Sequence, residues 1–199
     1  MKIGIFGGTF DPPHVGHLIL AGEAADQLHL DKVLWVVTPN PPHKRTQPIS
    51  QADQRSCLVQ AAIAEDASFE ISRVDLDRPA PHYSIDTVRI LAEENAGAKI
   101  YFLIGGDSLR DLPTWHRPEV LTHLVDGFGV LRRPGAEFDM SDLEEQIPGV
   151  NDKITFIDTP QIDISARVIR DRIQNRRHYR HFLPPGVFAL IEEHGWYKK

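Results

Sequence analysis

Residues 2–20 have the sequence KIGIFGGTFDPPHVGHLIL. Its apolar, β-branched start predicts a strand, and its continuation has the spacing of a helix. Gly7 and Gly8 can take backbone conformations closed to other residues, and the two prolines that follow prevent a helix from starting before about His14 or Val15. Open parallel sheets bind ligands beyond the carboxyl ends of their strands, so this turn indicates both the fold and the site.

The rest of the chain continues the alternation of strand and helix. Apolar residues at helical spacing predict a helix in SIDTVRILAEE (84–94). The pattern predicts a single α/β domain over residues 1–199, a Rossmann-like, doubly wound and mostly parallel sheet with helices on both faces. We expect the further strands in KVLWVVTP (32–39), FEISRV (69–74), KIYFLIG (99–105), GFGVLRR (127–133) and KITFID (153–158).

Two later segments have a distinct composition. Residues 132–152 are rich in acid and turn formers, and we interpret them as a surface excursion within the domain. The C-terminal stretch LPPGVFALIEEHGWYKK predicts a short helix that is entered through Pro184 and Pro185 and ends near Gly195.

Composition excludes several classes of function. Hydrophobic residues make up 41% of the chain and no apolar stretch approaches the ~18 residues that would span a membrane. The N-terminus has no long apolar stretch and no cleavage site, so we expect a cytoplasmic protein. Cys57 is the only cysteine, which excludes an intrachain disulfide, and its neighbours predict a small buried hydrophobe. The formal net charge of -6 argues against a nucleic-acid partner.

The turn after the first strand suits an anion. His14 and His17 are three residues apart on the first helical turn, where free backbone N–H groups and the helix dipole favour negative charge, with phosphate the leading candidate. Taken alone, the pair could also cap the helix, face water or bind a metal ion, although helical metal pairs more often use i, i+4 spacing and no third ligand is obvious. A dinucleotide site is weakly supported, because GIFGGTF lacks the order G-x-G-x-x-G.

The motifs of the chain resemble those of a known family. GTFDPPHVGH (8–17) resembles the signature of the H-x-G-H nucleotidyltransferase superfamily. The later motifs resemble, in order, those of the bacterial nicotinate-nucleotide adenylyltransferase family: TPNPPHK (38–44), HYSIDTVRIL (82–91), IGGDSLRDLPTWHRPEVL (104–121), LRRPG (131–135) and ISARVIRDRI (164–173). The resemblance implies transfer of AMP from ATP to nicotinate mononucleotide, giving deamido-NAD and pyrophosphate. It implies Mg²⁺ carried as Mg-ATP and no metal site built by the protein.

The resemblance also implies roles for individual residues. Catalysis would rest on His14, His17 and Lys44. ATP would be bound by Gly7, Gly8, Thr9, Phe10, Gly105, Asp107, Arg133, Ile164, Ser165, Arg167 and Arg170. The nicotinate nucleotide would be bound by Tyr83, Ser84, Thr87, Trp115 and His116, with Trp115 against the pyridine ring and Ser84 or Thr87 near the carboxylate.

Several of these residues also have a purely structural interpretation. Lys44 could be a solvated loop lysine, Asp107 a helix N-cap and Trp115 a core anchor. His116 stands where the family often has tyrosine. In ISARVIR, Ser165 is a good N-cap, and the chain has Ala166 and Arg167 where the family usually has hydroxyl residues.

The sequence leaves other functions open. Within enzymes, the acceptor could be nicotinamide mononucleotide or phosphopantetheine. In another class, the chain could be a catalytically silent nucleotide-binding regulator on the same fold. Whether it forms a homo-oligomer is also open.

Overall fold

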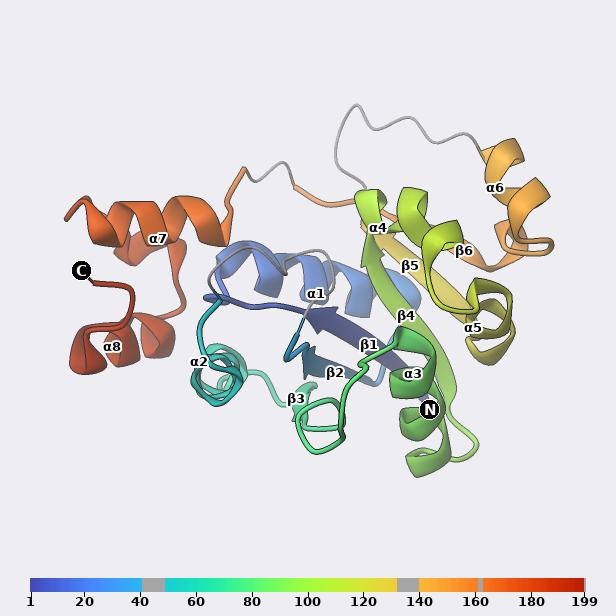
Figure 1. The fold of residues 1–199 in the computed structure, drawn as a ribbon, viewed down its shortest axis with the longest axis horizontal. Helices are drawn as coiled ribbons and strands as arrows, with labels where there is room; N and C mark the ends of the chain where they lie inside the picture. The colour runs from blue at the N-terminus through green and yellow to red at the C-terminus, as the bar shows by residue number, and fades with distance from the viewer. Residues whose placement is uncertain (41–48, 132–139, 161–162, 199) are drawn as a thin grey trace.

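The computed structural model describes residues 1–40, 49–131, 140–160 and 163–198, and its centre is a six-stranded sheet (Figure 1). The strands are β1 (Lys2–Gly8), β2 (Lys32–Val37), β3 (Phe69–Ser72), β4 (Lys99–Gly105), β5 (Gly127–Leu131) and β6 (Ile154–Ile157). They lie in the order β3-β2-β1-β4-β5-β6, and every pairing is parallel. The chain changes direction across the sheet between β1 and β4, and ligand crevices of doubly wound sheets form at such a point.

Helices cover both faces of the sheet, as predicted. They are α1 (Val15–Leu28), α2 (Ala52–Ile63), α3 (Ser84–Glu94), α4 (Gly106–Asp111), α5 (Pro118–Leu124), α6 (Met140–Gln146), α7 (Ala166–Gln174) and α8 (Pro185–His194). Buried side chains of α1, α2, α7 and α8 share one apolar cluster, and those of α3, α4, α5 and α6 share the other. The doubly wound α/β fold is therefore confirmed.

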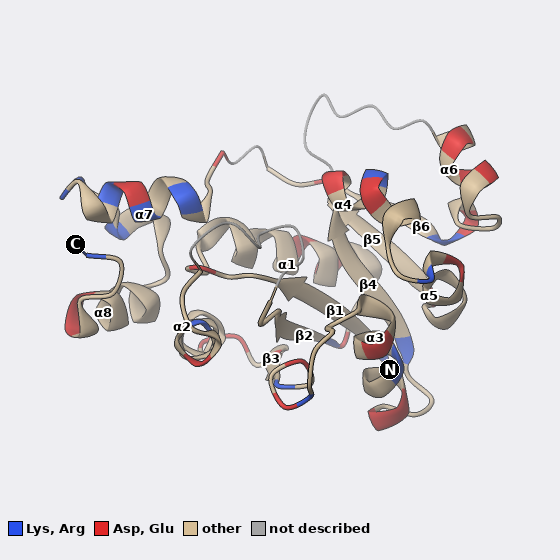
Figure 2. Cartoon of the chain, viewed as in Figure 1, with Lys and Arg blue, Asp and Glu red and all other residues tan. Residues whose placement is uncertain are grey.

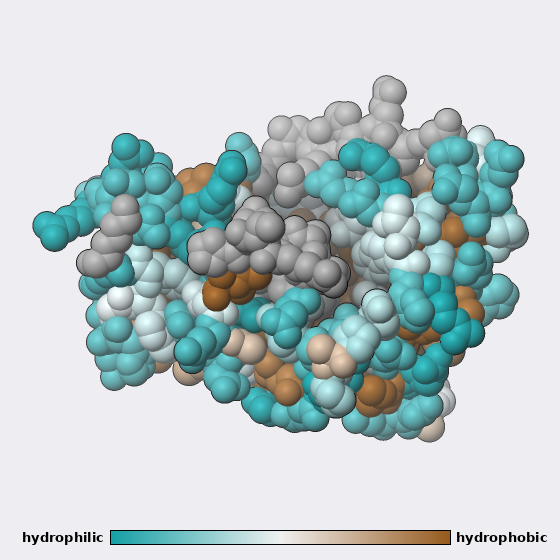
Figure 3. All heavy atoms as spheres, viewed as in Figure 1, coloured by the Kyte–Doolittle hydropathy of each residue, from teal (hydrophilic) through white to brown (hydrophobic). Residues whose placement is uncertain are grey.

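The middle residues of the central strands are mostly apolar because both faces of these strands are buried. Along β2, Val33, Trp35 and Val37 belong to the cluster with α1 and α2, whereas Leu34 and Val36 belong to the cluster with α3. This two-residue alternation between faces explains why the strand appears in the sequence as a continuous hydrophobic run. The outer surface, by contrast, is largely hydrophilic on the face that Figure 3 shows.

Two predictions need correction. Cys57 is exposed, because Leu58 and Val59 occupy the core side of α2 and the position before them faces outward. Residues 140–152 do not form a mere surface excursion, since α6 buries Leu143 and the chain after it buries Ile147 and Val150. The apolar side chains of this acidic stretch recur at helical spacing, which its turn formers obscured.

The C-terminal prediction is confirmed. Helix α8 begins at Pro185, and Gly195 follows its last residue in the left-handed conformation, with φ of 65°. No helix in the part of the chain that the structure describes is long and apolar enough to cross a membrane.

Candidate active site

The loop between β1 and α1 (residues 9–14) turns the chain from the sheet into the first helix. Helix α1 begins at Val15, and His14 is its N-cap with extended backbone, which confirms the predicted start. Phe10 is buried in the core with φ of 49°, so its side chain anchors the loop. Gly8 is required beneath it, because a Cβ there would lie 2.7 Å from the Phe10 ring.

The two histidines form a stacked pair at the start of α1. Their ring centroids are 3.7 Å apart and their planes differ by 26°. The backbone N–H of His14 donates to Nδ1 of His17 at 3.1 Å. Because Nδ1 accepts this hydrogen bond, the proton of a neutral His17 ring is carried by Nε2, which is thereby a donor. The edge of Phe10 packs against His17, with centroids 5.1 Å apart, and fixes the ring.

His14 is neutral because it is buried. His14 is only 6% exposed, and desolvation lowers the pKa of its imidazole from 6.5 to about 4. No described residue forms a hydrogen bond with its buried Nδ1. Gly16 makes room for this ring, since a Cβ at that position would lie 3.0 Å from His14 Nδ1. The glycine of the H-x-G-H motif thus permits the stacked geometry.

Arg55 of α2 holds the loop through hydrogen bonds to backbone carbonyls. Its guanidinium is almost fully buried and donates to the carbonyls of Thr9 at 2.7 Å, Thr38 at 2.9 Å and Pro39 at 2.9 Å. It therefore joins the end of β1 to the end of β2. Burial lowers the pKa of Arg55, and the nearby charge of Asp11 opposes that shift. This role of Arg55 could not be predicted from the sequence, because an arginine on a polar helix predicts a solvated side chain.

Asp11 joins the loop to the C-terminal part of the chain. Its carboxylate is buried and accepts from the Tyr197 hydroxyl at 2.8 Å and from the Ser50 N–H at 3.3 Å. Arg170 lies 3.7 Å from the carboxylate and donates to the Asp11 carbonyl at 2.6 Å. Burial and, secondarily, the charge of Asp11 raise the pKa of Tyr197. In this structure Arg170, predicted to contact ATP, holds the loop.

Helix α7 places its start beside the start of α1. Ser165 caps it by accepting from the Val168 N–H at 3.4 Å, as predicted. An ideal Cβ at Gly16 would lie 4.0 Å from the Cβ of Ile164, so this residue adjoins the H-x-G-H turn. Arg167 is exposed. In Figure 2, α7 is marked mainly as basic residues and α6 as acidic ones.

A cavity of about 540 Å³ opens at the carboxyl ends of β1 and β4. It gathers many of the predicted residues from separate elements. Its lining includes Gly7, Gly8, Thr9, Tyr83, Ser84, Thr87, Gly105, Trp115 and His116, together with Asp75, His82, Ser108, Asp111 and Thr114. The glycine loop and the predicted acceptor residues therefore face one shared space.

Aromatic side chains form one wall of this cavity. Trp115 is half-buried and packs edge-on against Phe102, with centroids 6.1 Å apart. Tyr83 stacks on His116 at 4.1 Å with planes 23° apart. Trp115 thus lines the cavity and also packs against the core, so it can be a site residue and a core anchor at once.

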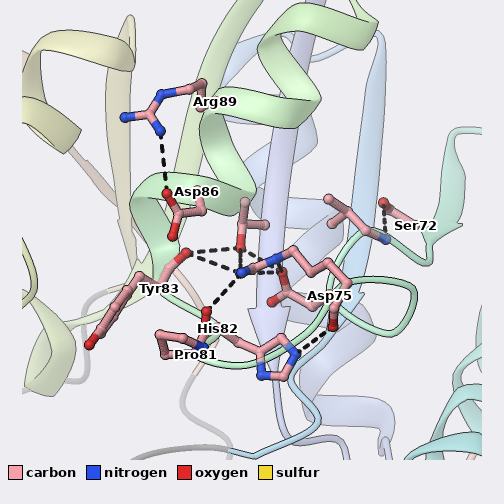
Figure 4. Close-up of polar contacts among 10 residues, drawn as sticks. Ser72, Asp75, Pro81, His82, Tyr83, Asp86 and Arg89 are labelled. Carbon is pink, nitrogen blue, oxygen red and sulfur yellow. Dashed lines mark hydrogen bonds and ion pairs between the residues drawn. The ribbon is translucent and has the colours of Figure 1, made fainter.

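Thr87 lines the cavity, and its donors have partners within the protein. Its hydroxyl is buried and donates to the Asp75 carboxylate at 2.7 Å, while its backbone N–H donates to the Tyr83 carbonyl at 3.2 Å. Both donors are thus used within the protein. Asp75 and its partner Arg78, neither of which the sequence singled out, belong to the polar contacts drawn in Figure 4.

The remaining predicted residues lie at the margin of the site or outside the described residues. Asp107 is exposed in the first turn of α4 and lies 3.7 Å from Arg110, and Gly105 rather than Asp107 is the N-cap. Lys44 and Arg133 lie outside the described residues. No group of three or more metal-binding side chains occurs among the residues that the structure describes.

Comparison with known proteins identifies the family. A model of the cytidylyltransferase-like family matches residues 5–172. A "Probable nicotinate-nucleotide adenylyltransferase" of Thermomicrobium roseum is 40% identical over 197 residues, which cover 99% of this chain and 92% of the relative. The chain belongs to the nicotinate-nucleotide adenylyltransferase family. A Geobacillus thermodenitrificans relative of the same name is also 40% identical, over 98% of this chain and 86% of its own length.

Solved structures agree with this fold. Plasmodium falciparum nicotinic acid mononucleotide adenylyltransferase complexed with NaAD superposes with a TM-score of 0.76 at 18% identity, covering 98% of this chain and 97% of that one. The same enzyme complexed with APC gives a TM-score of 0.76 at 17% identity. The predicted resemblance is thus confirmed, and the nicotinate-nucleotide adenylyltransferase fold extends over nearly the whole chain.

Proposed function

We propose that this protein transfers the adenylyl group of ATP to nicotinate mononucleotide, giving deamido-NAD and pyrophosphate. The observation that carries the proposal is the stacked pair of His14 and His17, which follows directly on the glycine loop that lines the cavity. Membership of the nicotinate-nucleotide adenylyltransferase family supports this choice of reaction.

The phosphate of the acceptor attacks the α-phosphorus of ATP in line. A new P–O bond forms as the bond from the α-phosphorus to the pyrophosphate oxygen breaks, so no covalent protein nucleophile takes part. The protein contributes position and electrostatic stabilisation. Nε2–H of His17 donates to a phosphoryl oxygen as charge develops there, and the N-terminus of α1 adds its dipole. The neutral ring of His14 can accept a proton when the triphosphate arrives.

The nucleotide brings its own metal ion. Mg²⁺ keeps several waters and is commonly held by substrate phosphates, so it enters as Mg-ATP. Lys44 and Arg133 are proposed to supply positive charge to the triphosphate, together with Arg167. Gly105 and Asp107 are proposed to lie near the nucleoside of ATP, where an exposed carboxylate can accept from ribose hydroxyls.

The acceptor is proposed to lie against the aromatic wall. Trp115 offers a plane to the pyridine ring, and the stacked Tyr83 and His116 line the same cavity. Backbone N–H groups at the start of α3, near Ser84, are proposed to bind the nicotinate carboxylate. Small molecules are thus the proposed partners, without nucleic acid, and the lone cysteine suits a reducing compartment such as the cytoplasm.

The test is turnover of three acceptors side by side. Purified protein is incubated with Mg-ATP and with nicotinate mononucleotide, nicotinamide mononucleotide or phosphopantetheine, and pyrophosphate release is followed. We expect the highest kcat/KM with nicotinate mononucleotide. Faster turnover of another acceptor would contradict the proposed acceptor, and absence of pyrophosphate release with all three would favour a catalytically silent nucleotide-binding protein.

A further inference from the structure

A largely buried ion pair lies at the acceptor wall of the cavity. The side chain of Asp75 is 5% exposed and that of Arg78 is 15% exposed, and their charged atoms are 2.9 Å apart. Asp75 lines the cavity, as do Tyr83 and Thr87, whereas Arg78 is not among its lining residues. A carboxylate in that position would repel an anionic ligand unless its charge were balanced.

Arg78 uses its guanidinium to hold the turn that precedes α3. It donates to Asp75 at 3.0 Å, to the Pro81 carbonyl at 2.9 Å, to the Tyr83 carbonyl at 3.3 Å and to the Thr87 hydroxyl at 3.2 Å (Figure 4). The pair thereby connects the loop after β3 to the first turn of α3. Such a planar fork of donors cannot be reproduced by lysine.

The held carbonyls set the direction of the neighbouring N–H groups. In a trans peptide the carbonyl and the following N–H point in opposite directions, and the Tyr83–Ser84 bond is trans. Because the Tyr83 carbonyl points toward Arg78, the N–H of Ser84 points to the other side. Figure 4 shows the Tyr83 ring directed away from Asp75 as well.

We propose that Arg78 is a positioning residue for the acceptor wall and that its pairing with Asp75 removes the repulsion that would otherwise disfavour an anionic substituent on the acceptor ring. The inference rests on the proposed function and deepens it. Together with the N–H groups of Asp86 and Thr87, Arg78 holds the Tyr83 carbonyl and so helps to orient the N–H of Ser84. It also balances the buried negative charge of Asp75, which lines the cavity. A carboxylate on the pyridine ring is then tolerated, and a carboxamide gains no advantage.

Two conservative variants separate charge from geometry. Asp75→Asn keeps an oxygen that can accept from Thr87 or Arg78 but removes the negative charge, so Arg78 is left uncompensated. We expect the ratio of kcat/KM for nicotinate over nicotinamide mononucleotide to rise about fivefold.

Arg78→Lys keeps the positive charge but loses the planar set of guanidinium donors. We expect it to raise the KM of both acceptors about fivefold, with that ratio and the KM of ATP unchanged.

The neighbouring pair Arg73 and Asp77 supplies the matched control. It is also an ion pair, at 2.7 Å, but its side chains are 54% and 60% exposed. Arg73→Lys and Asp77→Asn should leave every kinetic constant within about twofold of wild type. Thermal melting of all four variants shows whether each is folded, and if Arg78→Lys does not fold, Asp75→Asn decides.

Three results would overturn the inference. They are an unchanged acceptor ratio in Asp75→Asn, an unchanged acceptor KM in folded Arg78→Lys, and a change in the KM of ATP equal to that of the acceptor. Failure of the proposed function is distinguishable from these, because it would appear as absence of turnover of nicotinate mononucleotide by the wild-type protein.

Discussion

Single residues at the start of α1 owe their chemistry to burial and to one backbone hydrogen bond. His17 accepts at Nδ1 from the backbone of His14, which makes its Nε2 the donor. His14 is desolvated and uncharged. The sequence predicts that both histidines share one helical turn, because spacing is a local property. It could not predict that one is buried and neutral, because burial depends on residues distant in the chain.

The buried His14 predicts a pH dependence of stability. The unfolded state binds a proton near pH 6.5 and the folded state near pH 4, so stability is complete above 6.5 and falls as the pH is lowered toward 4. The loss from this group is on the order of 3 kcal/mol. We expect urea unfolding at pH 7.0, 5.5 and 4.5 to show a steeper loss for wild type than for His14→Asn. Parallel losses in the two proteins would contradict the buried, neutral state.

Elements were predicted well where their pattern is local. All six predicted strands occur, as does the helix over residues 84–94, because apolar periodicity is a property of each segment. Helix α6 was missed beneath the turn formers around it. In α1, Gly16 has a steric role: it leaves room for the imidazole ring of His14.

Helix α1 offers a comparison between two glycines. Ala at position 16 would place a Cβ 3.0 Å from His14 Nδ1, whereas a Cβ at Gly22 would meet nothing within 4 Å. Gly16→Ala should displace the His14 ring and lower kcat by about tenfold or more. Gly22→Ala should leave kcat unchanged and stabilise the protein by roughly 0.5–1 kcal/mol. Measured kcat and melting temperature check both, and equal activity of the two variants would exclude a steric role for Gly16.

At the scale of the whole molecule, the active-site loop is fastened by residues from three distant segments. Arg55, Arg170 and Tyr197 hold residues 9–11 from α2, α7 and the C-terminal tail. The sequence predicted the parallel sheet that brings these segments together. It could not predict the contact of Asp11 with Tyr197, which spans 186 positions, because neither residue has a local signal for its partner.

Tyr197→Phe tests this long-range fastening. Loss of a buried hydrogen bond to a charged group costs about 1.5–3 kcal/mol, and the loosened loop should raise the KM of ATP several-fold. Tyr179→Phe is the matched control, because its hydroxyl also donates to a carboxylate, that of Glu192, at an exposed site. It should change stability by less than about 0.5 kcal/mol. Equal destabilisation by the two substitutions in urea unfolding would show that the hydrogen bond from Tyr197 to Asp11 adds no more stability than an exposed one.

The most direct test of the central claim follows the adenylyl group itself. ATP labelled at its α-phosphorus is mixed with nicotinate mononucleotide and either wild type, His17→Ala or the control His123→Ala, whose histidine lies on the exposed side of α5. We predict that wild type and the control move the label into the dinucleotide, whereas His17→Ala does so on the order of 10²–10³ more slowly with little change in acceptor KM. Near wild-type transfer by His17→Ala, or label that stays in ATP with the wild-type protein, would contradict the account.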